Sequence, residues 1–438
     1  MPTAPPVFPL EFTAFAAALR TGHGRALQQV KLHGAQGVLS DVLIDACIQC
    51  GTYDPQCEAS RAPWLFSMVE TAGLQTRLGE ALAMLLKRAP TEDDDHRDLT
   101  QRSAMLRELA AAGSSDARKL LYASLARLPG SSADVIAGDD IVALDGMEGL
   151  VYVARQMGQW SLEDPHFWVD DARVEQCRVS EGAPAVLAVL EHEAATDPRI
   201  RRFLQVLAET RAQRSDHSHP PDDMAFTAGQ IVAYARDHPG DPCHWFRRWA
   251  LRAKASELEV VFLALLAEQV PVHAARLLRC FAQRGVPRFD SRLLPWLDHA
   301  DPAVGMAALR ALMSTRHPAL RAVALRRLAD GDPAGGIRLL TANFEEGDFA
   351  LHVPRLQTVD DVDERHHLGS NLVELCEAHP SADAFDCLLD VYEFSLCSTC
   401  RHRAVKVLLS LDMAPGWLRD EARFDAEPAT RELLQFDA

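Results

Sequence analysis

The residues best suited to chemistry in this chain are two groups of cysteines. Near the C-terminus, the stretch "FSLCSTCRHR" places Cys397 and Cys400 in a C-x-x-C spacing, followed by His402. Two thiolates at this spacing can hold one Zn²⁺ ion, which prefers four sulfur or nitrogen ligands in a tetrahedron. Two more cysteines stand upstream within about 25 residues, a separation that zinc-ligand pairs commonly span. The candidate zinc ligands are therefore Cys376, Cys387, Cys397 and Cys400.

A second group, in "ACIQCGTYDPQC", supplies Cys47, Cys50 and Cys57. Here Cys47 and Cys50 fall inside an expected helix, where a spacing of three residues places both on one face. For both groups the alternative stays open that each cysteine is a small buried apolar residue between helices. No expected strand precedes either C-x-x-C, which disfavours a redox dithiol of the strand–helix type.

Three acidic stretches also hold possible ligands or general acids. They are "TEDDDH" at 91–96, "GDDIVALDGME" at 138–148 and "DDVDERHH" at 360–367. None has the spacing of a calcium loop, and we expect each to be a solvated loop. The stretch 138–148 adjoins the apolar sequence "LVYVARQM" and is the candidate among them for a catalytic role.

Basic residues gather in one part of an acidic chain. Between 271 and 341 there are eleven Arg and five Asp or Glu, although the whole chain has a net charge of −17. Just upstream, "HWFRRWALRAK" at 244–254 interleaves aromatic and basic residues. Arg and Trp contribute most to many interfaces. The candidate partner contacts are therefore Arg247, Arg248, Trp249, Arg310, Arg321, Arg326 and Arg327.

This basic region has three interpretations. The arginines pair with neighbouring acids and the aromatics lie in the core, or the region binds an acidic protein, or the face 244–338 binds the phosphates of a nucleic acid. The high negative charge of the whole chain disfavours its general surface as a nucleic-acid binder.

The elements that must position these residues are helices with a regular start signal. Prolines at Pro302, Pro318 and Pro333 are preceded by Asp, His and Asp. Proline suits the first helical turn, and a preceding acid can cap it. Shifting the second segment by 16 residues aligns its apolar positions with those of the first, at i, i+3, i+4 and i+8. The pattern predicts a series of short amphipathic helices.

The same signals extend over most of the chain and predict an all-α fold without a regular sheet. Two Gly- or Asp-rich interruptions are expected, at 129–147 and 345–367. The expected helices are 10–20, 25–32, 38–49, 59–71, 74–88, 97–112, 115–128, 145–158, 168–178, 183–195, 198–213, 225–237, 243–254, 256–269, 271–284, 290–298, 302–314, 318–329, 333–344, 368–378, 382–394 and 399–411.

Composition restricts the location of the protein. The N-terminal "MPTAPPVFPLEF" lacks the basic and apolar regions of a signal peptide, and no apolar stretch reaches about 18 residues. Ten cysteines in such a chain indicate reduced thiols, so we predict a cytoplasmic protein without a membrane partner.

The stretch "HPALRAVALRRL" resembles the HEAT-repeat class of α-solenoids, in particular its short bacterial variants. The resemblance is best over 287–341 and extends over 181–341, although Gly305 stands where an Arg is common in the class. It implies an α-α superhelix whose stacked helices hold another macromolecule. We expect two such arrays, 1–213 and 225–438, joined by a hinge at 214–224.

No phosphate-binding loop, G-x-S-x-G or H-E-x-x-H motif is present, which disfavours an enzyme. The sequence therefore predicts a non-catalytic interaction scaffold whose partner is a protein. The alternatives are a nucleic-acid-binding or DNA-repair protein, since some base-excision glycosylases are built from HEAT-like repeats, and a zinc metalloprotein.

Overall fold

The computed structural model describes residues 5–86, 94–127, 135–181, 183–217, 226–238, 240–351 and 353–435. Over these residues the protein is all-α, as predicted, with 25 α-helices and four short 3-10 helices. The strands described are two residues each, β1 (Ala126–Arg127) and β2 (Val135–Ile136), paired antiparallel. None of the described helices is both long and apolar enough to cross a bilayer.

The chain forms two compact units, each described separately here. The terminal unit consists of Pro5–Ser218 together with Gly416–Ala438, and the internal unit is His219–Pro415. The expected arrays 1–213 and 225–438 place the last residues of the chain with the second array, whereas here they belong with the N-terminal helices. Most of the expected hinge, residues 218–224, lies outside the described residues.

The terminal unit contains thirteen of the helices. They are α1 (Phe12–Thr21), α2 (Arg25–His33), α3 (Val38–Ile48), α4 (Ala62–Thr71), α5 (Gln75–Leu85), α6 (His96–Ala111), α7 (Ser115–Ala123), α8 (Gly138–Glu163), α9 (Ala172–Glu181), α10 (Ala183–Thr196), α11 (Pro198–His217), α24 (Gly416–Ala422) and α25 (Pro428–Glu432).

The internal unit contains the others. They are α12 (Ala228–Asp237), α13 (Phe246–Arg252), α14 (Ala255–Ala267), α15 (Pro271–Leu278), η1 (Arg279–Phe281), η2 (Ser291–Leu293), α16 (Leu294–Leu297), α17 (Pro302–Leu312), α18 (Pro318–Ala329), α19 (Pro333–Ala342), α20 (Asp348–Leu351), η3 (Leu356–Thr358), α21 (Val362–Ala378), η4 (Ala382–Ala384), α22 (Phe385–Phe394) and α23 (Ser398–Ser410).

The proline start signal is confirmed at all three positions. Pro302, Pro318 and Pro333 stand in the first turns of α17, α18 and α19. The preceding side chains accept hydrogen bonds from the backbone, as in the 2.9 Å bond from the Ala303 N–H to Asp301 Oδ1. Each cap satisfies an amide that the first helical turn leaves without an intrahelical partner.

The expected interruptions are shorter than predicted. Helix α8 already begins at Gly138, within the predicted interruption 129–147, and bends at Gly146, whose φ of 56° is left-handed. Residues 129–134 of that stretch lie outside the described residues. Likewise α21 begins at Val362, where Asp361 accepts a hydrogen bond from the Glu364 N–H at 2.9 Å. Acidic residues at the start of a helix are stabilised by the positive end of the helix dipole.

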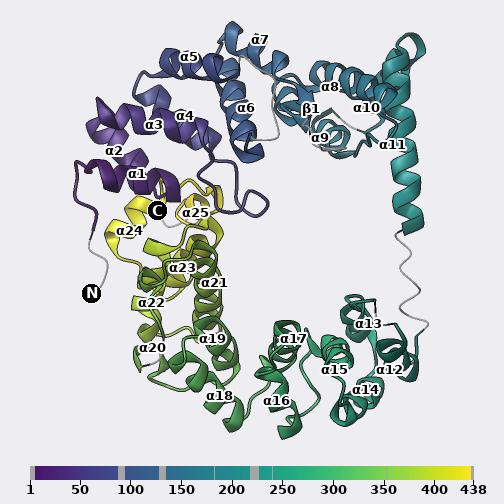
Figure 1. Cartoon of the computed structure of the whole chain (residues 1–438). Helices are drawn as coiled ribbons and strands as arrows, with labels where there is room; N and C mark the ends of the chain where they lie inside the picture. The colour runs from purple at the N-terminus through teal and green to yellow at the C-terminus, as the bar shows by residue number, and fades with distance from the viewer. Residues whose placement is uncertain are drawn as a thin grey trace. The chain divides into compact units, whose positions relative to one another are not determined.

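Helices close in sequence pack side by side within each unit (Figure 1). In the internal unit, for example, α18 lies against α19, α19 against α21 and α22 against α23. The largest fully buried apolar side chains include Phe246, Phe262 and Phe281 in this unit, and Phe15, Phe167 and Phe203 in the terminal unit. These helices are short, so most of the apolar burial comes from contacts between them.

Residues at the C-terminus complete the terminal unit through polar and close-packed contacts. Arg25 and Glu421 form a buried ion pair at 2.7 Å, and the Trp64 indole N–H donates to the Phe424 carbonyl at 2.8 Å. A Cβ built on Gly24 would stand 1.9 Å from the Glu421 carbonyl oxygen. Only glycine allows this approach, since a real Cβ contact at that distance is sterically forbidden.

Packing between α8 and α11 depends on another glycine, which gives a test of the fold. A Cβ on Gly158 would lie 1.8 Å from the Arg199 carbonyl oxygen, whereas one on Gly79 in α5 would meet nothing within 4 Å. We expect Gly158→Ala to lower the free energy of unfolding by about 2 kcal/mol through overpacking. Gly79→Ala should raise it by about 0.5 kcal/mol because alanine favours the helix. Urea denaturation measures both, and equal values would contradict the packing of these helices.

Candidate functional site

Three arginines from separate helical segments and a histidine surround a small pocket in the internal unit. Arg247 comes from α13, Arg279 from η1 and Arg310 from α17, and His244 precedes α13. The pocket has a volume of about 110 Å³. Its floor and walls are otherwise apolar, from Ala282, Ala303, Met306 and Ala307.

Aromatic packing fixes the elements that carry these arginines. In α13, Phe246, Trp249 and Ala250 are buried in the core, whereas the intervening Arg247 is half-buried and lines the pocket. The Trp249 indole N–H donates to the Phe226 carbonyl at 2.8 Å. In η1, the Phe281 ring packs edge-to-face against the Phe262 ring, with the ring centroids 6.0 Å apart. The arginines therefore stand on anchored backbone, which holds charged groups in place for a ligand.

The three guanidinium groups of the pocket have no acidic partner among the described residues. No ion pair or side-chain hydrogen bond joins any of them to a described residue, and Arg247 Nε and Arg279 Nη1 are buried without an acceptor there. Burial lowers the pKa of the Arg279 guanidinium, and repulsion from Arg247 and Arg310 lowers it further. Burial followed by repulsion from Arg247 and Arg338 has the same effect on the pKa of Arg310. Such a group of like charges favours an anion.

His244 adds a titratable group to the pocket. Its pKa lies below the ordinary value, first because of partial desolvation and then because Arg279 and Arg247 repel its protonated form. Asp241 acts in the opposite direction. That carboxylate is already engaged, since it accepts hydrogen bonds from the Tyr234 hydroxyl at 2.8 Å and from the Cys243 N–H at 2.7 Å.

The basic residues of the pocket are evenly spaced along the sequence. Arg247, Arg279 and Arg310 recur at intervals of about 30 residues, and Arg338 on α19 continues the series. Arg338 donates to Asn371 Oδ1 at 3.2 Å and approaches the Met306 sulfur at 3.8 Å. Each of these arginines belongs to a different helical segment, so the row crosses the helices instead of following one of them.

Arg321, Arg326 and Arg327, also expected to contact a partner, do not line this pocket. Arg321 bonds Asp348 at 2.7 Å and Glu345 at 3.1 Å. Arg326 and Arg327 both pair with Asp298, at 2.5 and 3.3 Å. For these three, the interpretation that outer-face arginines pair with nearby acids describes the structure.

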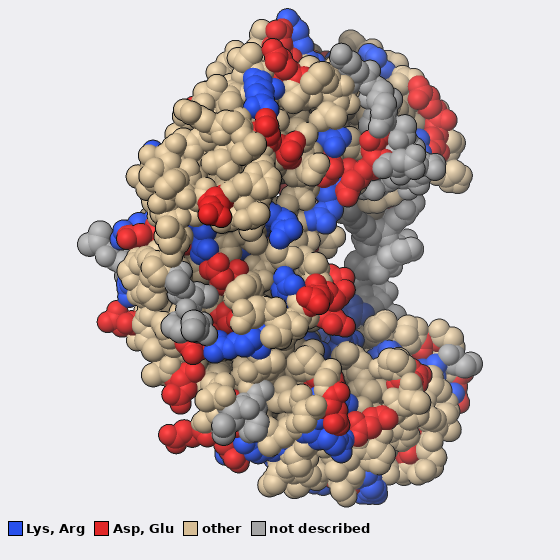
Figure 2. Space-filling view, turned by 60° about the vertical axis from the view of Figure 1, so that its left-hand side comes forward, with Lys and Arg blue, Asp and Glu red and all other residues tan. Residues whose placement is uncertain are grey.

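The two other predicted contacts on α13, Arg248 and Trp249, differ in burial. Trp249 is only 4% exposed and belongs to the core, whereas Arg248 is exposed beside it on α13. Figure 2 shows basic and acidic side chains interspersed over one face of the molecule. Within the basic face expected over 244–338, Arg321, Arg326 and Arg327 are therefore paired with acids.

The acidic stretch 138–148 forms the first part of α8, where two of its acids bond to side chains of α6 and α7. Asp140 is buried and accepts from Ser103 Oγ at 2.5 Å and from Arg107 at 3.0 Å. Desolvation raises its pKa, although both partners oppose that effect. Asp145 accepts from the Tyr122 hydroxyl at 2.6 Å. Both carboxylates are held by neighbouring side chains, which accounts for their placement without a catalytic role.

The other two acidic stretches begin helices. Asp95 caps α6 by accepting from the Arg97 N–H at 2.7 Å, and residues 91–93 lie outside the described residues. Asp361 caps α21, which brings His366 into the second turn of that helix. The expectation of solvated loops at 360–367 is therefore wrong from Val362 onward, because the capped acidic segment is helical.

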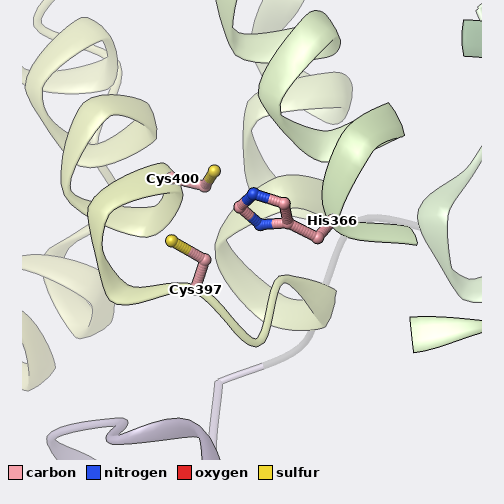
Figure 3. A group of neighbouring side chains, drawn as sticks. All are labelled: His366, Cys397 and Cys400. Carbon is pink, nitrogen blue, oxygen red and sulfur yellow. The ribbon is translucent and has the colours of Figure 1, made fainter. Parts of the chain in front are cut away.

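The C-terminal cysteines form two pairs. Cys397 and Cys400 lie together with His366, with ligand atoms all within 4.8 Å of one another (Figure 3). Cys376 and Cys387 are outside that group and contact each other through a thiol hydrogen bond, which raises the pKa of Cys376. Among the N-terminal cysteines, Cys47 is buried in α3, and burial raises its pKa as well.

The terminal unit contains a larger pocket of about 460 Å³, lined by Cys50, Asp54, Arg61 and His96 among others. Its charged groups largely satisfy one another. Arg61 pairs with Glu58 at 3.1 Å and donates to the Gly51 carbonyl at 3.1 Å. We therefore place the candidate site at the arginine pocket, where charge is left uncompensated by described residues.

Sequence reasoning missed Arg279 and His244, although a signal for Arg279 exists. It stands eight residues after Pro271, as Arg310 stands eight after Pro302. Arg326 has the same spacing from Pro318 but belongs to α18, which lies between α17 and α19 in the chain and faces elsewhere. His244 has no such signal, because it precedes a helix that lacks the proline start.

Comparison with known proteins does not add to these observations. No family model, curated protein or solved structure matches the chain.

The uncompensated charge predicts opposite effects on stability for two similar substitutions in the internal unit. Arg310→Gln should raise the free energy of unfolding by about 0.5 kcal/mol because it relieves repulsion and desolvation. Arg321→Gln should lower it by about 3 kcal/mol because it leaves the buried Asp348 without its cation. Chemical denaturation at low salt measures both, and destabilisation by Arg310→Gln comparable to that of Arg321→Gln would contradict an unpaired Arg310.

Proposed function

We propose that this chain is a helical-repeat binding protein of the HEAT-like type, whose internal unit holds an acidic segment of a partner protein. The observation that carries the proposal is the convergence of Arg247, Arg279 and Arg310 on one pocket without a carboxylate among the described residues. Grouping three positive charges is electrostatically unfavourable in the free protein. A bound anion would therefore be attracted by all three guanidinium groups at once.

The size of the pocket favours a carboxylate side chain. A volume of about 110 Å³ is below the range of about 300–1,000 Å³ typical of sites for small organic ligands. It accommodates one carboxylate, which guanidinium groups bind through paired, charge-assisted hydrogen bonds. The apolar contribution of Met306 and Ala307 suits the methylene groups of a Glu side chain.

The distribution of charge favours a protein over a nucleic acid. A nucleic acid presents closely spaced phosphates, and its binding needs a broad basic surface. In this region Arg321, Arg326 and Arg327 are paired with acids, and the whole chain has a net charge of −17. A narrow row of arginines suits a short acidic peptide segment better than a duplex or an extended strand.

The repeat supports an extended mode of recognition. Segments α13, η1, α17 and α19, with other helices between them in the chain, each contribute one basic residue at intervals of about 30 residues. In a stack of similar helix pairs, equivalent positions fall on one face and can meet successive side chains of a partner. Arg338 would extend the contact beyond the pocket, next to Met306.

Binding of a fluorescent hexaglutamate peptide tests the proposal. We expect saturable binding at low salt, weakened at least about tenfold by Arg310→Gln or Arg279→Gln, since each removes a charge that contacts the carboxylate. Fluorescence anisotropy measures the dissociation constants, with a hexaglutamine peptide as the neutral control. Arg326→Gln is the matched variant, because Arg326 is a surface arginine paired with Asp298, and it should leave the affinity within about twofold.

Two results would contradict this function. One is equal peptide binding by wild type, Arg279→Gln and Arg310→Gln, or no peptide binding at all. The other is tighter binding of a single- or double-stranded oligonucleotide than of hexaglutamate at the same salt, with the same variants affected, which would favour the nucleic-acid alternative.

His244 should make anion binding depend on pH. The pKa of His244 is held below its usual value by desolvation and by the arginines, and a bound anion should raise it. Binding then takes up a proton, so affinity should increase about threefold as pH falls from about 7.5 to about 5.5. Sulfate is the probe, because its charge is constant over this range. Calorimetric titration of wild type and His244→Gln measures the effect, and an unchanged pH dependence in the variant would exclude His244.

A further inference from the structure

The group of His366, Cys397 and Cys400 has the composition of a metal site and no part in the proposed binding of an anion. Their nitrogen and sulfur ligand atoms all lie within 4.8 Å of one another. His366 comes from the beginning of α21, whereas Cys397 and Cys400 come from the start of α23, and the two helices pack together. Figure 3 shows the imidazole ring directed toward both sulfur atoms.

We propose that His366, Cys397 and Cys400 bind one zinc-class divalent ion that connects α21 to α23, with a water molecule as the fourth ligand. Tetrahedral zinc with bonds of about 2.3 Å to sulfur and about 2.0 Å to nitrogen places its ligand atoms about 3.5–3.8 Å apart. The ligand atoms lie within 4.8 Å of one another, so side-chain rotations that move them by about 1 Å would complete the site.

The surroundings favour this ion over free thiolates. Cys397 and Cys400 are 2% and 3% exposed, so two thiolates without a cation would be strongly disfavoured there. A divalent ion with two thiolates and a neutral imidazole has no net charge, which removes most of that penalty. Without a cation the pKa of Cys400 is raised by its hydrogen bond to Cys397 and by burial, so the pair stays protonated until an ion displaces the protons.

The fourth position follows from the exposure of the group. Three protein ligands are present, and His366 is half-buried whereas both cysteines are buried. Water can therefore approach from the histidine side. Binding releases the two thiol protons to solvent while the imidazole binds as the neutral base, so affinity should fall as pH falls.

Cys376 and Cys387 provide an internal comparison. They are also buried in the internal unit and lie close enough for a thiol hydrogen bond, but no histidine or carboxylate joins them within the described metal-ligand groups. Two ligands alone do not make a tetrahedral site. The structure therefore assigns the ion to the C-x-x-C pair and His366 in place of a four-cysteine set.

Titration of the chelator-washed, fully reduced chain with Co²⁺ tests this assignment. We expect one Co²⁺ per chain, with thiolate-to-cobalt charge-transfer absorption and the visible bands of tetrahedral cobalt, all displaced by Zn²⁺. Cys397→Ser and Cys400→Ser should abolish the charge-transfer band of the native site. His366→Gln, at a half-buried position, should weaken binding at least about tenfold.

The matched control is the double variant Cys376→Ser with Cys387→Ser, which should retain one Co²⁺ and the same spectrum. Circular dichroism confirms that each variant keeps its helix content. The wild type and the control should gain thermal stability with Zn²⁺, whereas Cys397→Ser and Cys400→Ser should not. The proposal is overturned by absence of the cobalt–thiolate band in the wild type, by its equal loss in the control, or by a Cys397–Cys400 disulfide forming in place of metal uptake.

Discussion

Burial of apolar faces between short helices is the constraint on which the rest of this structure depends. Most helices here are short, and a single one can bury little apolar surface unless a neighbour covers it. Ala, Leu and a few aromatic residues supply that surface, as at Phe246, Phe262 and Phe281. Glycines such as Gly24 and Gly158 allow the closest backbone approaches. Polar residues are then left at the edges of each contact, where they must find partners of their own.

Several charged residues are held by partners on neighbouring helices. Arg321 with Asp348 in the internal unit and Arg25 with Glu421 in the terminal unit are examples. Against this background, the arginine pocket is distinctive because three cations meet without an acid among the described residues. The group of His366, Cys397 and Cys400 differs in kind, since it gathers neutral nitrogen and sulfur ligands that a cation could bind. Both sites are places where the folded chain leaves groups that a ligand can bind.

Helices were predictable because their signals are local. Caps and first-turn prolines, as at Asp301 and Pro302, act over three or four residues, and the apolar periodicity acts within one helix. Helix α8 and the start of α21 were misplaced because the Gly- and Asp-rich composition suggested loops, whereas acids at a helix start stabilise it. The placement of α24 and α25 with the N-terminal helices depends on contacts such as Trp64 to Phe424, which no local pattern encodes.

The sequence by itself determined the all-α class, the starts of most helices and the presence of a basic segment with a C-x-x-C after it. Tertiary structure alone decided which of those residues meet. Arg310 joins Arg247 and Arg279, whereas Arg326, with the same spacing from its proline, pairs with Asp298. Cys397 and Cys400 lie beside His366, and the predicted partners Cys376 and Cys387 are outside that group. The physical reason is that hydrogen bonding and periodicity are properties of one helix, but the angle at which helices pack decides which side chains converge.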